Sequence, residues 1–149
     1  MRSRISSFFV LIFTFQFGSA QVVENFFDGD FTNDPVWSGD TDLFLVEANQ
    51  LNTQSPTAGN YYLSTPSNLA LNTQWDFYFN MKFGTSGVNY TDVYLVSDSA
   101  NLTTPNNGYF VRIGGSADEV SLYKIVGGVE TILIDGPNDV DPWGREALY

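Results

Sequence analysis

The sequence of 149 residues contains no cysteine and no histidine. Without cysteine the chain has neither disulfides nor thiol chemistry, so buried apolar surface has to stabilise it, and aromatic residues make up 16% of the sequence. Without histidine it lacks the commonest general base and the commonest metal ligand of proteins. Together these absences exclude every Ser-His and Cys-His catalytic arrangement.

Basic residues are scarce as well. The sequence has six Lys and Arg against 17 Asp and Glu, which gives a formal net charge of −11 at pH 7. A surface with this charge repels phosphate groups and anionic lipid headgroups. We therefore expect neither nucleic acid nor a membrane surface among the partners of this protein.

Long hydrophobic runs are also missing, and the apolar run near the N-terminus is short. Arg2 and Arg4 precede about ten apolar residues, and small residues follow up to Ala20. A helix that spans a bilayer needs roughly 20 apolar residues, so this run is too short for an anchor and is typical of a signal peptide. We predict a signal peptide over residues 1–20 and a secreted, extracellular or cell-surface protein with no membrane insertion after cleavage. Cleavage removes two basic residues and changes the net charge to −13.

Alternation of apolar and polar residues with a period of two runs through the rest of the chain, and helical periodicity does not. The predicted strands are 22–27, 43–47, 50–53, 60–65, 75–83, 92–97, 108–113, 119–126 and 129–134. Ala48-Asn49 and Gly127-Gly128 predict two-residue hairpin turns between neighbouring strands. Short strands with regular turns predict an all-β fold, either a barrel or two antiparallel sheets packed face to face. We favour the two-sheet sandwich.

The length beyond the signal peptide fits one domain. We predict a β-sandwich domain over residues 21–136 and an irregular tail with few contacts over residues 137–149, because Gly136-Pro137 interrupts the strand pattern. If strands of a longer protein are missing there, one edge of a sheet stays unpaired.

The clearest alternation lies in residues 75–83 and predicts which side chains form the core. The odd-numbered residues of this segment are apolar, and its even-numbered residues are polar or aromatic. The predicted core set is Trp75, Phe77, Phe79, Met81 and Phe83, and the predicted outer set is Tyr78, Asn80 and Lys82.

On the neighbouring predicted strands, the residues that alternate with the predicted core residues point outward, and they predict a ligand surface. Phe110 shares the outward parity, and the predicted ligand-binding residues are Tyr78, Tyr94, Arg112 and Tyr123. Sugars present C–H faces to aromatic rings and hydroxyls to charged groups, so this mixture suits a carbohydrate or an extended peptide. The alternative is that these aromatic residues are covered by other parts of the structure.

Acidic residues crowd one early loop, which includes Asp28, Asp30 and Asp34. Carboxylate and carbonyl oxygens suit Ca²⁺, so a structural calcium ion is one interpretation. Asp next to Gly and Pro also forms turns without any metal, and this is the alternative. No other cofactor is expected.

No catalytic motif is present, and we expect no enzyme activity. A glycoside hydrolase needs two converging carboxylates, and the adjacent pair Asp118-Glu119 points to opposite faces of a strand. A relationship to glycoside hydrolases is a minor alternative.

Five segments occur in an order that resembles a known family: 28–40, 62–66, 93–98, 107–115 and 119–123. Over residues 24 to 136 the chain resembles the laminin-G-like, concanavalin A-like jelly-roll domain at the N-terminus of large secreted bacterial cell-surface proteins, where it often precedes lamin-tail-like modules. The resemblance implies a jelly-roll sandwich that binds a glycan or a protein without catalysis. The family domain continues for several strands beyond Gly127-Gly128, which implies that this sandwich is incomplete at its C-terminus.

Two functions therefore remain open. The first is an exported, non-catalytic module that binds a glycan or a cell-surface partner. The second is a structural spacer, or a fragment, of a larger secreted protein with no ligand of its own.

Overall fold

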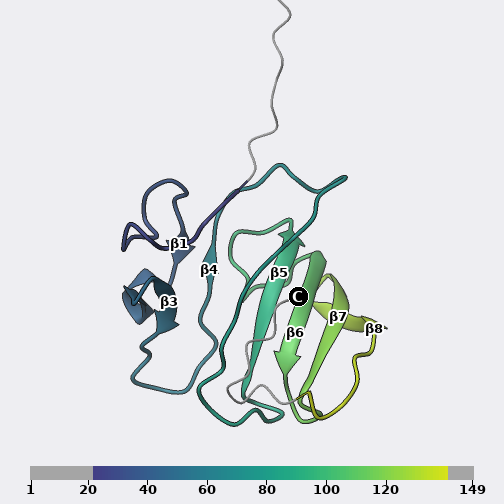
Figure 1. Cartoon of the computed structure of the whole chain (residues 1–149). Coiled ribbons are helices and arrows are strands. Elements are labelled where there is room, and N and C mark those ends of the chain that lie inside the picture. Colours follow the sequence, from purple (N-terminus) through teal and green to yellow (C-terminus); the bar gives the residue numbers. More distant parts are fainter. Residues whose placement is uncertain (1–21, 141–149) are drawn as a thin grey trace, which may run out of the picture.

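The computed structural model describes residues 22–140, so the predicted signal peptide lies outside the described residues. These residues form an all-β fold of antiparallel sheets without an α-helix (Figure 1). The elements in chain order are β1 (Ser38–Gly39), the 3-10 helix η1 (Thr41–Leu43), β2 (Phe44–Glu47), β3 (Gln50–Thr53), β4 (Leu63–Ser64), β5 (Tyr90–Ser97), β6 (Gly108–Gly114), β7 (Glu119–Val126) and β8 (Val129–Ile134).

The largest sheet is a meander in the order β5-β6-β7-β8, in which each strand pairs with its neighbour in sequence. β-branched and aromatic residues dominate its strands, as expected for residues that pack well on a pleated surface. Gly127 and Gly128 join β7 to β8 with φ angles of +56° and +84°. Both values are positive, as a two-residue type I′ hairpin requires, and the predicted hairpin is confirmed.

Two small sheets lie to one side of the meander in Figure 1. The strands β2 and β3 form a hairpin, and β1 pairs with β4. Ala48 and Asn49 turn the first hairpin with φ angles of +51° and +60°, so this turn also lies where the sequence predicts it. The ends of three predicted strands, 50–53, 119–126 and 129–134, are confirmed at both termini.

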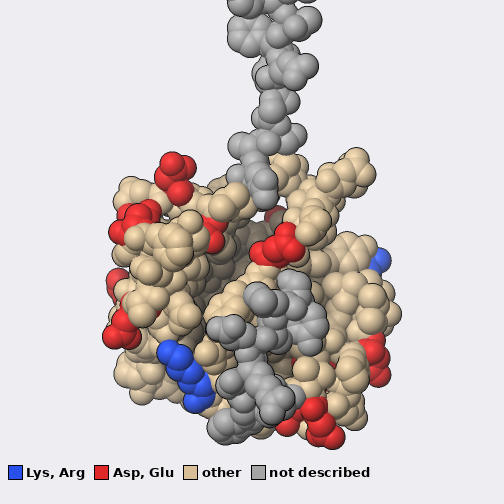
Figure 2. Space-filling view, viewed as in Figure 1, with Lys and Arg blue, Asp and Glu red and all other residues tan. Residues whose placement is uncertain are grey.

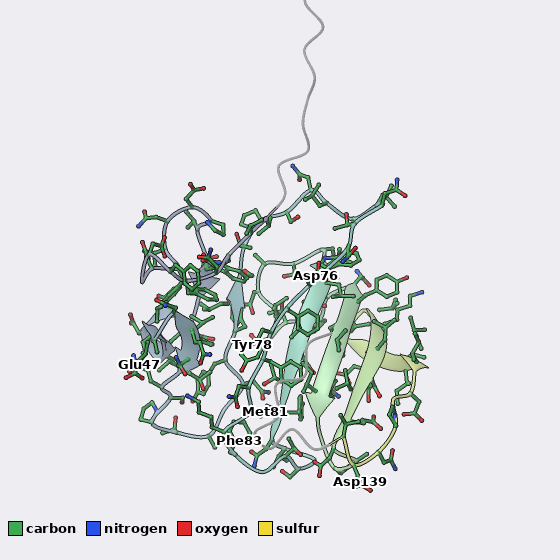
Figure 3. The ribbon with its side chains drawn as sticks, viewed as in Figure 1. Glu47, Asp76, Tyr78, Met81, Phe83 and Asp139 are labelled. Atoms are coloured by element: carbon green, nitrogen blue, oxygen red, sulfur yellow. The ribbon has the colours of Figure 1, made fainter. Side chains whose placement is uncertain are left out.

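The predicted strands at 22–27 and 75–83 do not form. Neither segment pairs with a neighbouring strand, and alternation by itself supplies no hydrogen-bond partner. In the view of Figure 3 the segment that carries Tyr78, Met81 and Phe83 runs along β5.

The predicted core of residues 75–83 is confirmed in its middle and wrong at its ends. Met81 is buried and Phe77 and Phe79 are half-buried, whereas Trp75 and Phe83 are exposed. The predicted outer set, Tyr78, Asn80 and Lys82, is exposed. Alternation therefore assigns the side chains of this segment to the correct two sets. The exposure of the residues at its ends depends on which other segments of the chain cover those residues.

The core of the described residues is built on both faces of the four-stranded sheet. Phe110 and Ile125 are buried on one face, and Ile113 is buried on the other. The outward placement of Phe110 that parity predicts is therefore wrong. Its ring is fully buried because Tyr94 and Tyr123 stack against it from the neighbouring strands. In a sheet that is covered on both faces, both alternating sets of side chains are buried. Alternation along a single strand does not reveal this.

The segment after β8 has more contacts than the sequence predicts. The N–H of Gly136 donates to the hydroxyl of Ser121 at 2.9 Å. The N–H groups of Asp139 and Val140 donate to the carbonyls of Ala117 and Asp118. The prediction of few contacts over residues 137–149 is wrong for Asp139 and Val140, because the β6–β7 turn offers free carbonyls to the returning chain. The rest of the predicted tail lies outside the described residues.

The burial of Phe110 leads to a stability prediction with a matched control. Phe110 is 0% exposed, whereas Phe27 is 72% exposed. Phe110→Ala should lower the free energy of unfolding by roughly 3–5 kcal/mol, because it leaves a cavity between two stacked rings. Phe27→Ala should change it by less than about 0.5 kcal/mol. Urea unfolding followed by tryptophan fluorescence measures both changes, and equal effects would contradict this description of the core.

Candidate functional site

Polar and aromatic side chains gather around Arg112 on one face of the four-stranded sheet. Arg112 lies in the middle of β6, directly opposite Asp92 of β5 and Ser121 of β7. Directly opposite residues project to the same face of a sheet, so the three side chains are neighbours. We call the surface formed by Tyr90, Asp92, Tyr94, Phe110, Arg112, Ser121, Tyr123 and Glu130 the Arg112 face.

The guanidinium of Arg112 is held by two carboxylates. Its Nε and Nη2 donate to the two oxygens of Asp92, each at 2.8 Å. Its Nη1 and Nη2 donate to the two oxygens of Glu130 at 3.0 and 3.1 Å. These bonds use four of the five guanidinium N–H groups. Arg112 therefore connects β5, β6 and β8, and it passes over β7 to do so.

Aromatic rings surround the same guanidinium. Its Cζ lies 4.2 Å from the ring centre of Tyr90, 4.9 Å from that of Tyr123 and 5.2 Å from that of Phe110. These distances are within the range of cation–π attraction. Phe110 in turn stacks on Tyr94 and Tyr123 with centroid distances of 5.0 and 5.1 Å. The result is a row of three rings across β5, β6 and β7 with a cation at one side.

Exposure differs between the two carboxylates. The side chains of Arg112 and Asp92 are 16% and 20% exposed, whereas that of Glu130 is 40% exposed. Burial raises the pKa of the Asp92 carboxyl above its usual value, although Arg112 counteracts the rise. The hydrogen bonds to Asp92 hold the pKa of Arg112 above its usual value. Burial also raises the pKa of the Tyr94 and Tyr123 hydroxyls. The inner pair is thus partly desolvated, and the outer carboxylate faces water.

Three of the four predicted ligand-binding residues lie together. Tyr94, Arg112 and Tyr123 share the Arg112 face, whereas Tyr78 is exposed on the irregular segment 75–83. Ligand binding by these four residues stays a prediction.

The sequence interpretation missed Tyr90, Asp92 and Glu130. Tyr90 and Asp92 lie four and two residues from Tyr94 along β5, so alternation in the sequence could have placed them on the same face as Tyr94. Glu130 also had a signal, because the predicted Gly127-Gly128 hairpin sets Glu130 opposite Ile125, whose side chain shares the face of Tyr123.

The acidic loop at the start of the domain uses its carboxylates in turns. The N–H of Asp30 donates to Asp28, and the N–H and hydroxyl of Thr32 donate to Asp30. The hydrogen bonds that Asp30 accepts, first from the N–H of Thr32 and then from the side chains of Asn33 and Thr32, lower its pKa to about 2. Asp34 precedes Pro35 in the same loop and is exposed. Across residues 22–140 no group of three or more acidic side chains is arranged to hold a metal ion. Calcium binding by Asp28, Asp30 and Asp34 stays a prediction.

Comparisons with known proteins add no relative: neither a family model, nor a curated protein, nor a solved structure matches this chain. Among the described residues, no helix is long and apolar enough to cross a membrane. The functional argument therefore rests on the Arg112 face.

The double ion pair leads to a prediction about its two inner partners. Arg112→Met should lower the free energy of unfolding by roughly 3 kcal/mol, because it leaves the carboxylate of Asp92 partly buried without a partner. The double variant Arg112→Met, Asp92→Leu should recover at least half of this loss, because the unpaired charge is gone. Chemical denaturation of both variants is the measurement. A double variant that is less stable than Arg112→Met would contradict this account.

The opposite pKa shifts of Asp92 and Asp98 lead to a pH prediction. The raised pKa of Asp92 means that its contribution to stability is complete below its unfolded pKa and is lost as the pH rises through its folded pKa. Asp98 behaves in the opposite way: the N–H of Asn107 lowers its pKa, so its contribution is lost as the pH falls through that lower value. NMR titration of the carboxyl carbons should place the pKa of Asp92 above that of Asp98. The reverse order would contradict the assigned burial of Asp92.

Proposed function

We propose that this protein is an exported, non-catalytic all-β module that binds a glycan or a cell-surface partner through the Arg112 face. The supporting observation is the combination of stacked aromatic rings with carboxylates that Arg112 holds in fixed positions. Aromatic rings contact the C–H faces of a sugar, and oriented carboxylates accept hydrogen bonds from its hydroxyls. The signal-peptide pattern of residues 1–20 supports export to a place where such partners occur.

Within this proposal Arg112 is a positioning residue. Four of its N–H groups already donate to Asp92 and Glu130, so it has little capacity left for a ligand. Glu130 is the more exposed carboxylate, and each carboxylate oxygen has further acceptor capacity. Glu130 and the exposed ring of Tyr90 would then make the first contacts, with Tyr94 and Tyr123 behind them.

The jelly-roll fold belongs to the same proposal. The ordered set of motifs between residues 24 and 136 resembles laminin-G-like, concanavalin A-like domains, and the all-β antiparallel structure is compatible with that resemblance. We propose that the module stands at the N-terminus of a larger cell-surface protein, with a structural Ca²⁺ in the loop of Asp28, Asp30 and Asp34 as an open alternative to turn formation. The acidic surface, which Figure 2 shows at several separate places, disfavours anionic ligands.

A structural spacer is the second candidate function. It is favoured by the saturation of the Arg112 face, where the cation, both carboxylates and the rings are partners of one another. A cluster that is satisfied internally stabilises a sheet without any ligand.

Binding and spacer functions differ in one measurement. The chain without its signal peptide should bind a subset of neutral glycans on an array, and Tyr90→Ala should weaken that binding at least about tenfold, as expected when a ring that contacts the ligand is removed. Tyr109→Ala is the matched control, since Tyr109 is 40% and Tyr90 37% exposed, but Tyr109 projects from the opposite face of the sheet.

Equal effects of Tyr90→Ala and Tyr109→Ala would contradict ligand binding at the Arg112 face. Absence of binding to any glycan or extracellular protein, with an intact cooperative melt, would favour the spacer.

A further inference from the structure

The chain contains a single Asn-Gly pair, Asn107-Gly108, at the point where the loop of residues 98–107 between β5 and β6 enters β6. In such a pair the backbone nitrogen of the glycine can attack the side-chain amide of the asparagine, and this attack releases ammonia. Glycine obstructs the attack least, because it has no Cβ. Every other asparagine of the sequence is followed by a residue with a side chain. Asn107 is therefore the asparagine with the most reactive neighbour in the chain.

Asn107 is held on two sides in the structure. Its N–H and Nδ2 donate to the two carboxylate oxygens of Asp98 at 2.7 and 2.5 Å, and its carbonyl accepts from the N–H of Asp98 at 3.0 Å. Its Oδ1 accepts from the N–H of Gly127 at 2.8 Å. Both ends of the side-chain amide are thus bound, and Asn107 joins the end of β5 to the β7–β8 turn.

The backbone that follows Asn107 is fixed as well. Gly108 is paired with Ser97 of β5 and with Ile125 of β7. A Cβ at Gly108 would lie 2.2 Å from the carbonyl oxygen of Val96, so β5 approaches this glycine closely. The attack requires rotation about the bonds of Asn107, and the strand pairing and the bound amide oppose this rotation. Asn107 itself is exposed to water. The fold therefore opposes the attack by geometry and not by excluding water.

We propose that Asn107 is a site of spontaneous deamidation, closed in the folded chain and reactive when the β5–β6 loop detaches from the β7–β8 turn. Openings of this kind are local, and they cost less free energy than global unfolding. The reaction needs water and no enzyme, and it is independent of any ligand on the Arg112 face. An opening thus allows an irreversible change at this junction.

The bond changes balance with water as the only co-reactant. The nitrogen of Gly108 loses its proton to solvent and attacks Cγ of Asn107, so that a C–N bond closes a five-membered succinimide ring. The Cγ–Nδ2 bond breaks, and Nδ2 takes up a proton and leaves as ammonia. Water then opens the ring at either carbonyl and returns a proton to the nitrogen of Gly108. The product is an aspartyl or an isoaspartyl residue, and the isoaspartyl backbone is longer by one carbon.

Either product weakens the junction that Asn107 holds. A carboxylate has no N–H to donate to Asp98, and two like charges then face each other. In the isoaspartyl form the extra backbone carbon lies directly before β6, where Gly108 has close neighbours on both sides. The modified chain should therefore open at this junction more easily than the unmodified chain.

Peptide mass spectrometry of the whole chain without its signal peptide tests the site, because each conversion replaces an amide NH2 group by OH. In concentrated urea, Asn107 should deamidate at least about tenfold faster than Asn101, an internal control that precedes Leu102. Without urea, the rate at Asn107 should fall at least about tenfold, because the reaction waits for local opening. Equal rates at the two asparagines in urea overturn the proposal, and so do equal rates at Asn107 with and without urea.

The contact to Asp98 is tested in the folded chain. Asp98→Ala removes the acceptor of two N–H groups of Asn107 and should raise the rate of deamidation there at least about threefold. Asp28→Ala removes an exposed carboxylate from a different loop and should leave the rate unchanged. Both variants are first checked for a cooperative melt above the incubation temperature. An unchanged rate in folded Asp98→Ala overturns the proposed protection, and if this variant does not fold, the comparison with and without urea decides alone.

The consequence for the junction is tested with the aspartyl product itself. Asn107→Asp should lower the melting temperature by about 3–6 °C, because one hydrogen bond is lost and a like charge is added. Asn101→Asp adds the same charge in the same loop but keeps an acceptor for the N–H and hydroxyl of Thr103, so it should lower the melting temperature much less. Equal shifts in the two variants overturn the claim that the conversion weakens this junction.

Discussion

The double ion pair of Arg112 connects the largest sheet of this protein. Its guanidinium joins Asp92 on β5 to Glu130 on β8 and covers the ring of Tyr123 between them. A chain without disulfides has to hold its strands together by packing and hydrogen bonds, and this cluster does both in one place. The ring of Phe110 is buried beneath it, so the core of this face and the polar surface above it depend on the same side chain.

The same interaction determines which surfaces remain available for partners. Because one Arg112 binds two carboxylates, Asp92 and Glu130, the cluster keeps one net negative charge beside the exposed apolar side chains of β8. Because Arg112 also fixes Asp92, the rings and carboxylates of the Arg112 face keep one geometry. The proposed glycan would use the exposed side of that face.

Much of the fold was predictable from local chemistry. Gly127-Gly128 and Ala48-Asn49 adopt positive φ angles and turn hairpins where the sequence indicates them, and β7 and β8 have the predicted ends. The segment 75–83 has the strongest alternation in the chain and still forms no strand. Alternation reports which side chains share a face, whereas a strand also needs a neighbour with free hydrogen-bonding groups, and the local sequence does not contain that neighbour.

By itself, the sequence determined the all-β class, the hairpin turns and the common face of Tyr94, Arg112 and Tyr123, because turn residues and a period of two are local properties. Tertiary structure decided that Phe110 is core rather than surface, since burial depends on rings contributed by two other strands. It also decided the partner of Arg112 on β8. The register that follows the Gly127-Gly128 hairpin sets Glu130 opposite Ile125 and within 3.0 Å of the guanidinium, and this contact across β7 arises only when the strands pair.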